Sequence, residues 1–185
     1  PLLAKYGIAK VSLPGGCAIG SRPINFHLDA LKKMGTKIKI KDGYIFASAK
    51  KGLKGCVIKF PKISVGATEN ILIAACFAKG ETKLRNCAIE PEINDLIYFL
   101  KKLGCKIKRI GKRSINVLGV GKLKPAVHKI IFDRIEAGTY IIAAALTKGR
   151  LKIKNINPKL ILTEIRLLHK MGVDIIKRKN HVIVN

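Results

Sequence analysis

The chain has 185 residues, of which 37 are lysine or arginine and 11 are acidic, so its formal net charge is +26 at pH 7. Hydrophobic residues make up 48% and aromatic residues only 5%, which is typical of a globular protein with an aliphatic core. The longest apolar runs, 71–78 and 140–146, are far too short to span a bilayer, so we predict no membrane partner. No signal segment opens the chain, so we predict a cytoplasmic protein. A helical pattern is already under way at Pro1, so we expect a fragment of a longer protein.

The strong positive charge raises the question of a nucleic-acid partner. The lysines are spread along the whole chain rather than clustered, and aromatic residues that could stack on bases are scarce. Lysine, isoleucine and asparagine are over-used together, which is typical of a genome-wide composition bias. These features disfavour nucleic acid as a partner. A lysine-rich nucleic-acid-binding α/β module nevertheless stays open as an alternative function.

The five cysteines are Cys17, Cys56, Cys76, Cys87 and Cys105. None forms a close pair, so no zinc-ligand spacing is present, and their odd number fits reduced thiols. We therefore predict neither a metal nor a cofactor. Four of the cysteines have strand or helix residues around them and are predicted to be small buried hydrophobic residues. Only Cys17 lies in a glycine-rich loop.

The sequence repeats itself at a shift of 69 residues, which places residues 64–75 on residues 133–144. Each copy contains a helix that ends near a glycine, a short alternating strand, a loop, a helix that a proline opens, and two further strands. The predicted unit is βαβαββ, and the fold class is α/β (α+β), with sheets packed on helices.

The predicted elements can be placed along the chain by this pattern. In order they are a helix that ends at Gly7, a strand over 9–13, a helix over 23–35, strands over 37–40 and 44–48, a helix that ends at Gly80, a strand over 82–86, a helix over 91–104, strands over 106–110 and 114–118, a helix that ends at Gly149, a strand over 151–155 and a helix over 158–172. In the helix over 91–104 an apolar stripe is expected to face the core. The stripe consists of Ile93, Leu96, Ile97 and Leu100. Residues 119–122 are predicted to form a hairpin turn.

The loop between the short strand and the proline-led helix differs between the copies. It has two residues in the third copy (156–157), four in the second (87–90) and nine in the first (14–22). Because two residues suffice to close the scaffold, the extra length indicates a function rather than a folding requirement. The long loop places Cys17 near Arg22, and a cation lowers the pKa of a neighbouring thiol. We therefore predict that Cys17 is a reacting residue.

The copies also differ at the start of their other helix, the one that ends at Gly80 in the first case and at Gly149 in the second. The first copy has a lysine, a serine and a glycine over 62–66, whereas the second has Asp133 and Glu136. Small residues and a hydroxyl group at a helix start, with a lysine upstream, suit a phosphate group that the acidic residues would repel. Residues 62–66 are thus predicted to bind a phosphate-bearing ligand. His27 is a candidate ligand contact, with a structural role as its alternative.

Four stretches together carry a resemblance to a known family: 13–23 with His27, 62–68, 90–93 and 133–139. They resemble the enolpyruvyl transferases of the UDP-N-acetylglucosamine 1-carboxyvinyltransferase family. The resemblance implies six βαβαββ units in two globes, each an inside-out α/β barrel, of which this chain would be an incomplete part. Residues 1–131 would belong to the globe with the cysteine loop, without its first repeat. Residues 132–185 would be the first part of a repeat of the second globe.

The resemblance also implies a reaction. It is the transfer of the enolpyruvyl group of phosphoenolpyruvate to the 3′-hydroxyl of UDP-N-acetylglucosamine, with release of phosphate, as the first committed step of peptidoglycan synthesis. Cys17 would deliver a proton to the methylene carbon of phosphoenolpyruvate and could add to it covalently, and fosfomycin alkylates the equivalent residue of the family. The isolated fragment is expected to be inactive. A non-catalytic remnant of the enzyme is a further alternative.

The same resemblance implies a set of substrate-binding residues that need no metal. They are Arg22, Pro23, Ile24, Asn25, Phe26, His27, Lys62, Ile63, Ser64, Val65 and Gly66. Asn25 stands where the family commonly has an aspartate.

Overall fold

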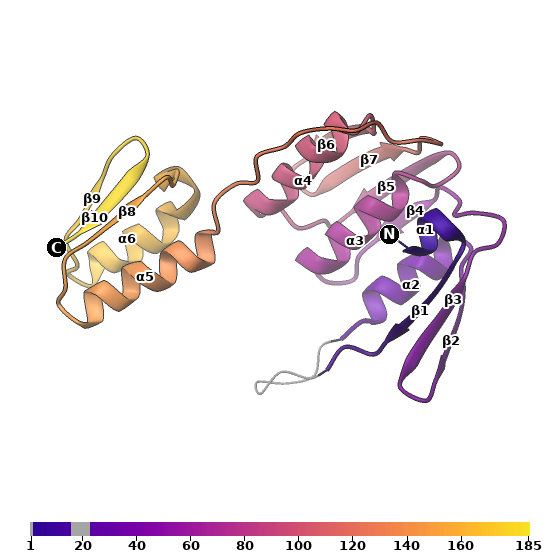
Figure 1. The fold of residues 1–185 in the computed structure, drawn as a ribbon, viewed down its shortest axis with the longest axis horizontal. Helices are drawn as coiled ribbons and strands as arrows, with labels where there is room; N and C mark the ends of the chain where they lie inside the picture. The colour runs from indigo at the N-terminus through magenta and orange to yellow at the C-terminus, as the bar shows by residue number, and fades with distance from the viewer. Residues whose placement is uncertain (1, 16–22) are drawn as a thin grey trace. The chain divides into compact units, whose positions relative to one another are not determined.

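The computed structural model describes residues 2–15 and 23–185 of the chain. These residues form two compact units, one within residues 1–128 and the other over 129–185 (Figure 1). The boundary after residue 131 that the sequence predicted refers to the two globes of a complete enzyme. That boundary and the assignment of the two parts to these globes stay predictions.

The first unit begins with a three-stranded antiparallel sheet. After the short helix α1 (Leu2–Tyr6), the strands β1 (Ile8–Ser12), β2 (Lys37–Lys41) and β3 (Tyr44–Ser48) pair in the order β1-β3-β2. The turn between β2 and β3 is the two residues Asp42 and Gly43, with φ of 50° and 74°. Two positive φ values fit a tight hairpin turn that matches the strand twist, which explains a glycine here.

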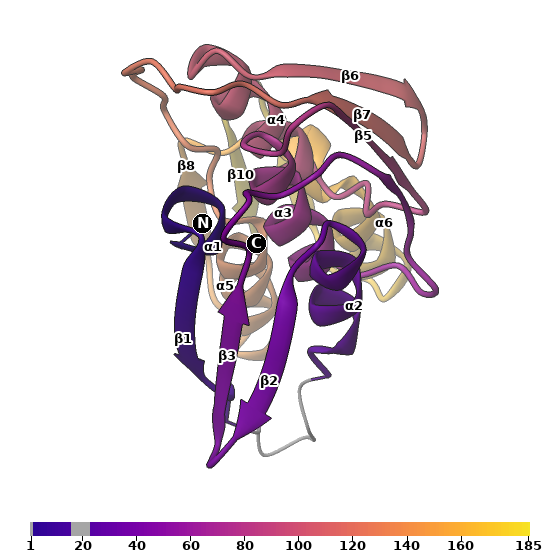
Figure 2. The same cartoon turned by 90° about the vertical axis from the view of Figure 1, so that its right-hand side faces the viewer.

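The second sheet of this unit has four strands. They are β4 (Val57–Lys59), β5 (Glu81–Arg85), β6 (Lys106–Gly111) and β7 (Ser114–Leu118), in the order β4-β5-β7-β6. Strand β4 runs parallel to β5, and the other pairs are antiparallel. The helices α2 (Asn25–Lys33), α3 (Val65–Ala75) and α4 (Pro91–Lys102) complete the unit, and α3 and α4 pack on the second sheet (Figure 2).

The core of the first unit lies between these helices and the sheets. Ile71 of α3, Ile93 of α4 and Ile115 of β7 are fully buried. The predicted apolar stripe of α4 is confirmed, since Ile97 and the other stripe residues are buried or packed against this core. Apolar burial of this kind contributes about 1.5–3 kcal/mol for each large aliphatic side chain.

The second unit contains all but the first strand of one βαβαββ repeat, since no strand precedes α5 among its residues, all of which the structure describes. Its elements are α5 (Arg134–Leu146), β8 (Leu151–Lys154), the 3-10 turn η1 (Pro158–Ile161), α6 (Leu162–Lys170), β9 (Ile175–Lys177) and β10 (His181–Val184). The strand order β8-β10-β9 is the order of β1-β3-β2 and of β5-β7-β6, so the predicted repeat is confirmed. Its separate core includes Ile141, Ile165 and Val182.

The strand predictions agree closely with the structure, whereas two of the three proline-led helices begin later than predicted. Every strand that was given bounds from the sequence is confirmed to within one residue at each end. Pro91 opens α4 as predicted. Helix α2 begins at Asn25, two residues after Pro23, and the amide of His27 donates to the carbonyl of Ile24 in its first turn. Pro158 opens a 3-10 turn, in which the amide of Leu160 donates to the carbonyl of Asn157 and the Asn157 side chain accepts from Lys159 N at 3.1 Å.

The prediction of a hairpin turn over 119–122 is wrong. No strand follows Leu118 in the first unit, all of whose residues after this point the structure describes. Instead, the amide of Gly119 donates to the carbonyl of Gly80, and the amide of Val120 donates to that of Cys76. A Cβ atom on Gly119 would lie 1.7 Å from the carbonyl oxygen of Ala78. The glycine is therefore required by close backbone approach and not by a turn.

Candidate substrate-binding site

The two stretches predicted to bind the ligand, 23–27 and 62–66, lie together in the structure. They form the starts of α2 and α3, which are neighbouring helices of the first unit (Figure 1). Atom Cε1 of His27 is 3.7 Å from the position that a Cβ on Gly66 would occupy. Residues almost 40 positions apart in the sequence thus face each other at two helix N-termini. Such ends concentrate backbone N–H groups without intrahelical partners.

The start of α3 is held by its own side chains. Ser64 has an extended backbone, and its Oγ accepts from Ala67 N at 3.2 Å, so this hydroxyl is an N-cap. Thr68 is fully buried, donates to the carbonyl of Ser64 at 2.7 Å and accepts from Ala88 N at 3.1 Å. The Ser64 hydroxyl therefore caps the helix and is not a free group for a ligand. The amides of Val65 and Gly66 remain as the donors available to a ligand.

His27 is half-buried, and this burial lowers the pKa of its imidazole below the ordinary value of 6.5. The ring is therefore neutral at pH 7. Its Nδ1 lies 3.1 Å from Nδ2 of Asn70, in the second turn of α3. Asn70 is not among the residues predicted from the sequence. Its position four residues after Gly66 places both on one face of the helix, which is the signal that could have identified it.

A cavity of about 380 Å³ adjoins this pair of residues. Its lining is mostly aliphatic, with Pro14 and Ile24 near the ends of the long loop and with Ser12, His27 and Asn70 as polar residues, and it includes none of residues 62–66. A largely apolar cavity with a few polar groups is the usual form of a small-molecule site.

The side chains of the predicted substrate-binding residues do not all face a ligand. Phe26 and Val65 pack against the core, so only their backbone groups are available to a substrate. Asn25, Lys62 and Ile63 are exposed at the same two helix starts. Of the remaining predicted residues, Pro23 and Gly66 are exposed and Ile24 is half-buried. Cys17 and Arg22 lie outside the described residues, so their roles stay predictions.

The other cysteines behave as structural residues. Cys76, Cys87 and Cys105 are buried, as predicted, whereas Cys56 is half-buried. Burial raises the pKa of each of these four thiols, and it raises the pKa of Cys87 to about 11. They are therefore protonated at neutral pH and poor nucleophiles. Within the described residues, no group of three or more His, Cys, Asp or Glu side chains could hold a metal ion.

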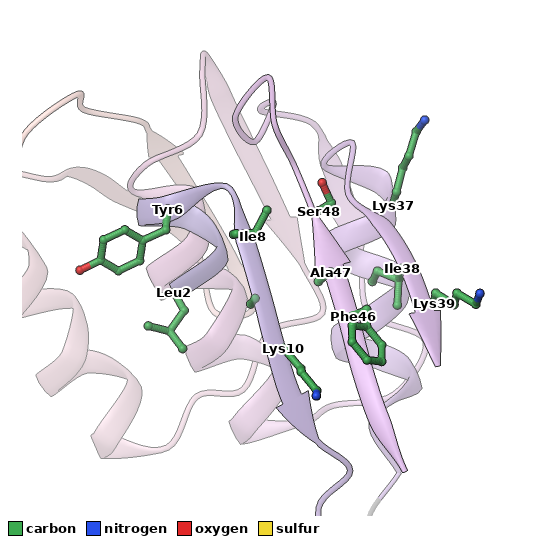
Figure 3. A pocket seen from close by; sticks show the side chains of 11 residues that line it. Leu2, Tyr6, Ile8, Lys10, Lys37, Ile38, Lys39, Phe46, Ala47 and Ser48 are labelled. Atoms are coloured by element: carbon green, nitrogen blue, oxygen red, sulfur yellow. The ribbon is translucent and has the colours of Figure 1, made fainter. Parts of the chain in front are cut away.

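A second hollow of about 660 Å³ lies along all three strands of the first sheet, β1, β2 and β3 (Figure 3). Its polar lining is dominated by lysines, and Lys10 Nζ lies 4.5 Å from the ring centroid of Tyr44 and 5.3 Å from that of Phe46. The described residues that line this hollow include no carboxylate, thiol or imidazole group. Its titratable side chains are lysines and Tyr6, and none of the predicted substrate-binding residues lines it, so it is not the candidate site.

Comparison with known proteins gives the family. The family model for EPSP synthase (3-phosphoshikimate 1-carboxyvinyltransferase) matches residues 1–185. The chain is 60% identical over 184 residues to the UDP-N-acetylglucosamine 1-carboxyvinyltransferase of Pelagibacter ubique, covering 100% of this chain and 44% of that protein. It is 50% identical over 184 residues to the protein of the same name from Rickettsia prowazekii, again covering 100% of this chain and 44% of the relative.

Solved structures support the fold. The enolpyruvyl transferase NikO from Streptomyces tendae superposes with a TM-score of 0.84 at 24% identity, over 100% of this chain and 45% of that chain. EPSP synthase from Acinetobacter baumannii gives a TM-score of 0.67 at 22% identity, over 95% of this chain and 42% of that chain. The chain thus spans less than half of the proteins that it matches. No helix among the described residues is long and apolar enough to cross a membrane. The family match along the whole chain confirms the resemblance seen in the sequence: the chain belongs to the EPSP synthase family of enolpyruvyl transferases.

Proposed function

We propose that the complete protein transfers the enolpyruvyl group of phosphoenolpyruvate to the 3′-hydroxyl of UDP-N-acetylglucosamine and releases phosphate. The observation that carries this proposal is the approach of His27 to Gly66, which joins the two stretches that the resemblance assigns to the sugar nucleotide. Relatives at 50–60% identity have the corresponding name. A cytoplasmic location and a place at the first committed step of peptidoglycan synthesis belong to the same proposal.

The start of α3 suits the diphosphate of the sugar nucleotide. The amides of Val65 and Gly66 and the positive end of the helix dipole favour an anion, and Lys62 is exposed just upstream. Ser64 would contribute backbone groups, because its hydroxyl caps the helix. The start of α2, with Asn25 exposed in its first turn, would contact the uridine.

Cys17 and Arg22 would supply the chemistry at phosphoenolpyruvate. In the proposed step the thiol of Cys17 protonates the methylene carbon while the sugar 3′-hydroxyl attacks the neighbouring carbon, which gives a tetrahedral intermediate. Loss of phosphate and of one proton from the new methyl group then restores the carbon–carbon double bond. Of the two protons lost, one from the 3′-hydroxyl and one from the methyl group, one returns to the thiolate and the other leaves with the phosphate. Arg22 would attract the anionic substrate, and a cation lowers the pKa of a neighbouring thiol.

The proposal is tested by turnover of the complete protein. Phosphate release from phosphoenolpyruvate should depend on UDP-N-acetylglucosamine, and mass spectrometry should detect the enolpyruvyl ether of the sugar nucleotide. Phosphate release without this product would contradict the proposal. Salt-sensitive RNA binding in place of turnover would favour the nucleic-acid alternative, and neither activity would favour a non-catalytic remnant.

A further inference from the structure

We infer that Asn70 is a positioning residue that holds His27 in the tautomer with its proton on Nε2. In this tautomer the ring presents an N–H donor beside the start of α3, where it can bind an oxygen atom of the ligand. The identity of that ligand as a sugar nucleotide rests on the proposed function. The role of Asn70 rests on the contacts below.

The hydrogen bond between the two side chains fixes the tautomer. Nδ2 of Asn70 is an amide nitrogen, which can only donate, and it lies 3.1 Å from Nδ1 of His27. Nδ1 must therefore accept. In a neutral imidazole the proton is then on Nε2. The lowered pKa of His27 keeps the ring in its neutral form at pH 7.

The edge of the ring that carries this proton faces the first turn of α3. Cε1 and Nε2 of His27 lie 3.7 Å and 3.9 Å from the position of a Cβ on Gly66. Because residue 66 is a glycine, no side chain stands between the ring and the helix start. The Nε2–H group and the amides of Val65 and Gly66 are thus all donors in one small region, which suits an oxygen acceptor such as a phosphate or carbonyl group.

The opposite tautomer would present a lone pair at Nε2, which repels the same acceptor. In a ring that is kept neutral by measurement at alkaline pH, a substitution of Asn70 by aspartate produces that tautomer and keeps a hydrogen bond between α2 and α3, because a carboxylate accepts from an Nδ1–H group. The alkaline pH is needed because a neighbouring carboxylate also favours the doubly protonated ring. Asn70→Asp therefore separates a positioning role from a merely structural one. Asn70→Ala removes the fixed tautomer without adding a charge.

The experiment measures both the tautomer and the affinity in the complete protein. In the wild type, nitrogen-15 NMR of the imidazole should show His27 protonated at Nε2, and in Asn70→Asp at Nδ1. The Kd for UDP-N-acetylglucosamine by calorimetry should rise about three- to tenfold in Asn70→Ala, the effect of one neutral hydrogen bond, and further in Asn70→Asp. In a variant that already has His27→Ala, Asn70→Ala should cause no additional loss of affinity for UDP-N-acetylglucosamine.

A matched control is present in the second unit. Asn180 also pairs with a histidine, but its Oδ1 lies 3.0 Å from Nδ1 of His181 on an exposed surface. Asn180→Asp adds the same charge beside a histidine and should leave the Kd unchanged. A wild-type ring protonated at Nδ1, or an equal loss of affinity on Asn70→Ala with and without His27, would overturn the inference. Binding without turnover would contradict the proposed reaction and leave this inference standing.

Discussion

His128 Nε2 lies 2.9 Å from Asp95 Oδ1, in a pair whose side chains are only 11% and 14% exposed. The imidazole also stacks on Phe99 of α4, with ring centroids 5.3 Å apart. His128 is the last residue of the first unit, so this pair fastens the end of the segment over 119–128 to α4. The amide of Lys124 adds a hydrogen bond to the carbonyl of Leu103. The segment thus packs along the helices instead of forming a strand.

Removal of this pair should destabilise the first unit. Asp95→Ala or His128→Ala should each cost about 2 kcal/mol, the range for a largely buried hydrogen bond to a charged group. The double variant should lose less than the sum, because each single change already breaks the shared contact. Urea unfolding of the complete protein, followed by hydrogen exchange in α4, measures these values.

An exposed ion pair provides the control for this prediction. Lys32 Nζ lies 3.5 Å from Asp29 Oδ1, with side chains 56% and 62% exposed. Asp29→Ala should change stability by less than about 0.5 kcal/mol, because exposed pairs contribute little. Equal losses of unfolding free energy for Asp29→Ala and Asp95→Ala would show that the pair of His128 and Asp95 does not stabilise the first unit.

Gly119→Ala should destabilise the first unit strongly. The added methyl group would lie 1.7 Å from the carbonyl oxygen of Ala78, and backbone on both sides cannot yield without loss of hydrogen bonds. We expect a loss of more than about 2 kcal/mol, typical of severe overpacking. Gly121→Ala is the control, because nothing lies within 4 Å of the new methyl group. The two variants are compared by thermal unfolding, and equal melting temperatures would refute the close contact.

The buried thiols should resist alkylation in the native protein. Iodoacetamide at pH 7.5 should leave Cys76, Cys87 and Cys105 unmodified, whereas unfolding in urea should expose all three; peptide mass spectrometry reads the pattern. The pKa of Cys87 is raised from 9.0 to about 11, so the unfolded chain releases this proton at a lower pH than the folded one. Folding stability should therefore fall as the pH rises from about 9 towards about 11. Rapid native labelling of Cys87 would contradict this account.

Asn25→Asp should tighten binding of UDP-N-acetylglucosamine to the complete protein. Asn25 is the first residue of α2, where a carboxylate also interacts favourably with the helix dipole. A carboxylate accepts a hydrogen bond from an imide N–H, such as that of uracil, more strongly than an amide does. We expect a Kd lowered about threefold, by calorimetry. Weaker binding would exclude the contact between Asn25 and the uridine.

Local patterns predicted most of this fold, because the elements depend on local chemistry. Alternating residues set the strands, and helix periodicity set the buried face of α4 around Ile93. The hairpin predicted at Gly119 failed for a different reason. Position 119 requires a glycine because the carbonyl oxygen of Ala78 leaves no space for a Cβ atom. Ala78 is a neighbour in space, which no local pattern reveals.

Only part of the candidate site could be predicted, because local patterns do not reveal contacts between distant parts of the sequence. Comparison of the copies identified 62–66 and the long loop, since differences between repeats mark what folding does not require. His27 and Asn70 are 43 positions apart, so their hydrogen bond could not be predicted from local spacing, although the position of Asn70 four residues after Gly66 could have marked it as a candidate. Likewise, sequence alone could not decide that the hydroxyl of Ser64 serves as a cap, because a cap and a phosphate ligand favour the same residue at a helix start.

The proposed reaction depends on Cys17, and labelling with fosfomycin tests the reactivity of this thiol. The complete protein is incubated with fosfomycin and UDP-N-acetylglucosamine, and intact-mass and peptide mass spectrometry follow. We predict a single adduct on Cys17, with the four other cysteines unmodified. In Cys17→Ala the adduct and turnover should be lost while sugar-nucleotide binding is kept. No adduct on Cys17, or full turnover by Cys17→Ala, would contradict the account.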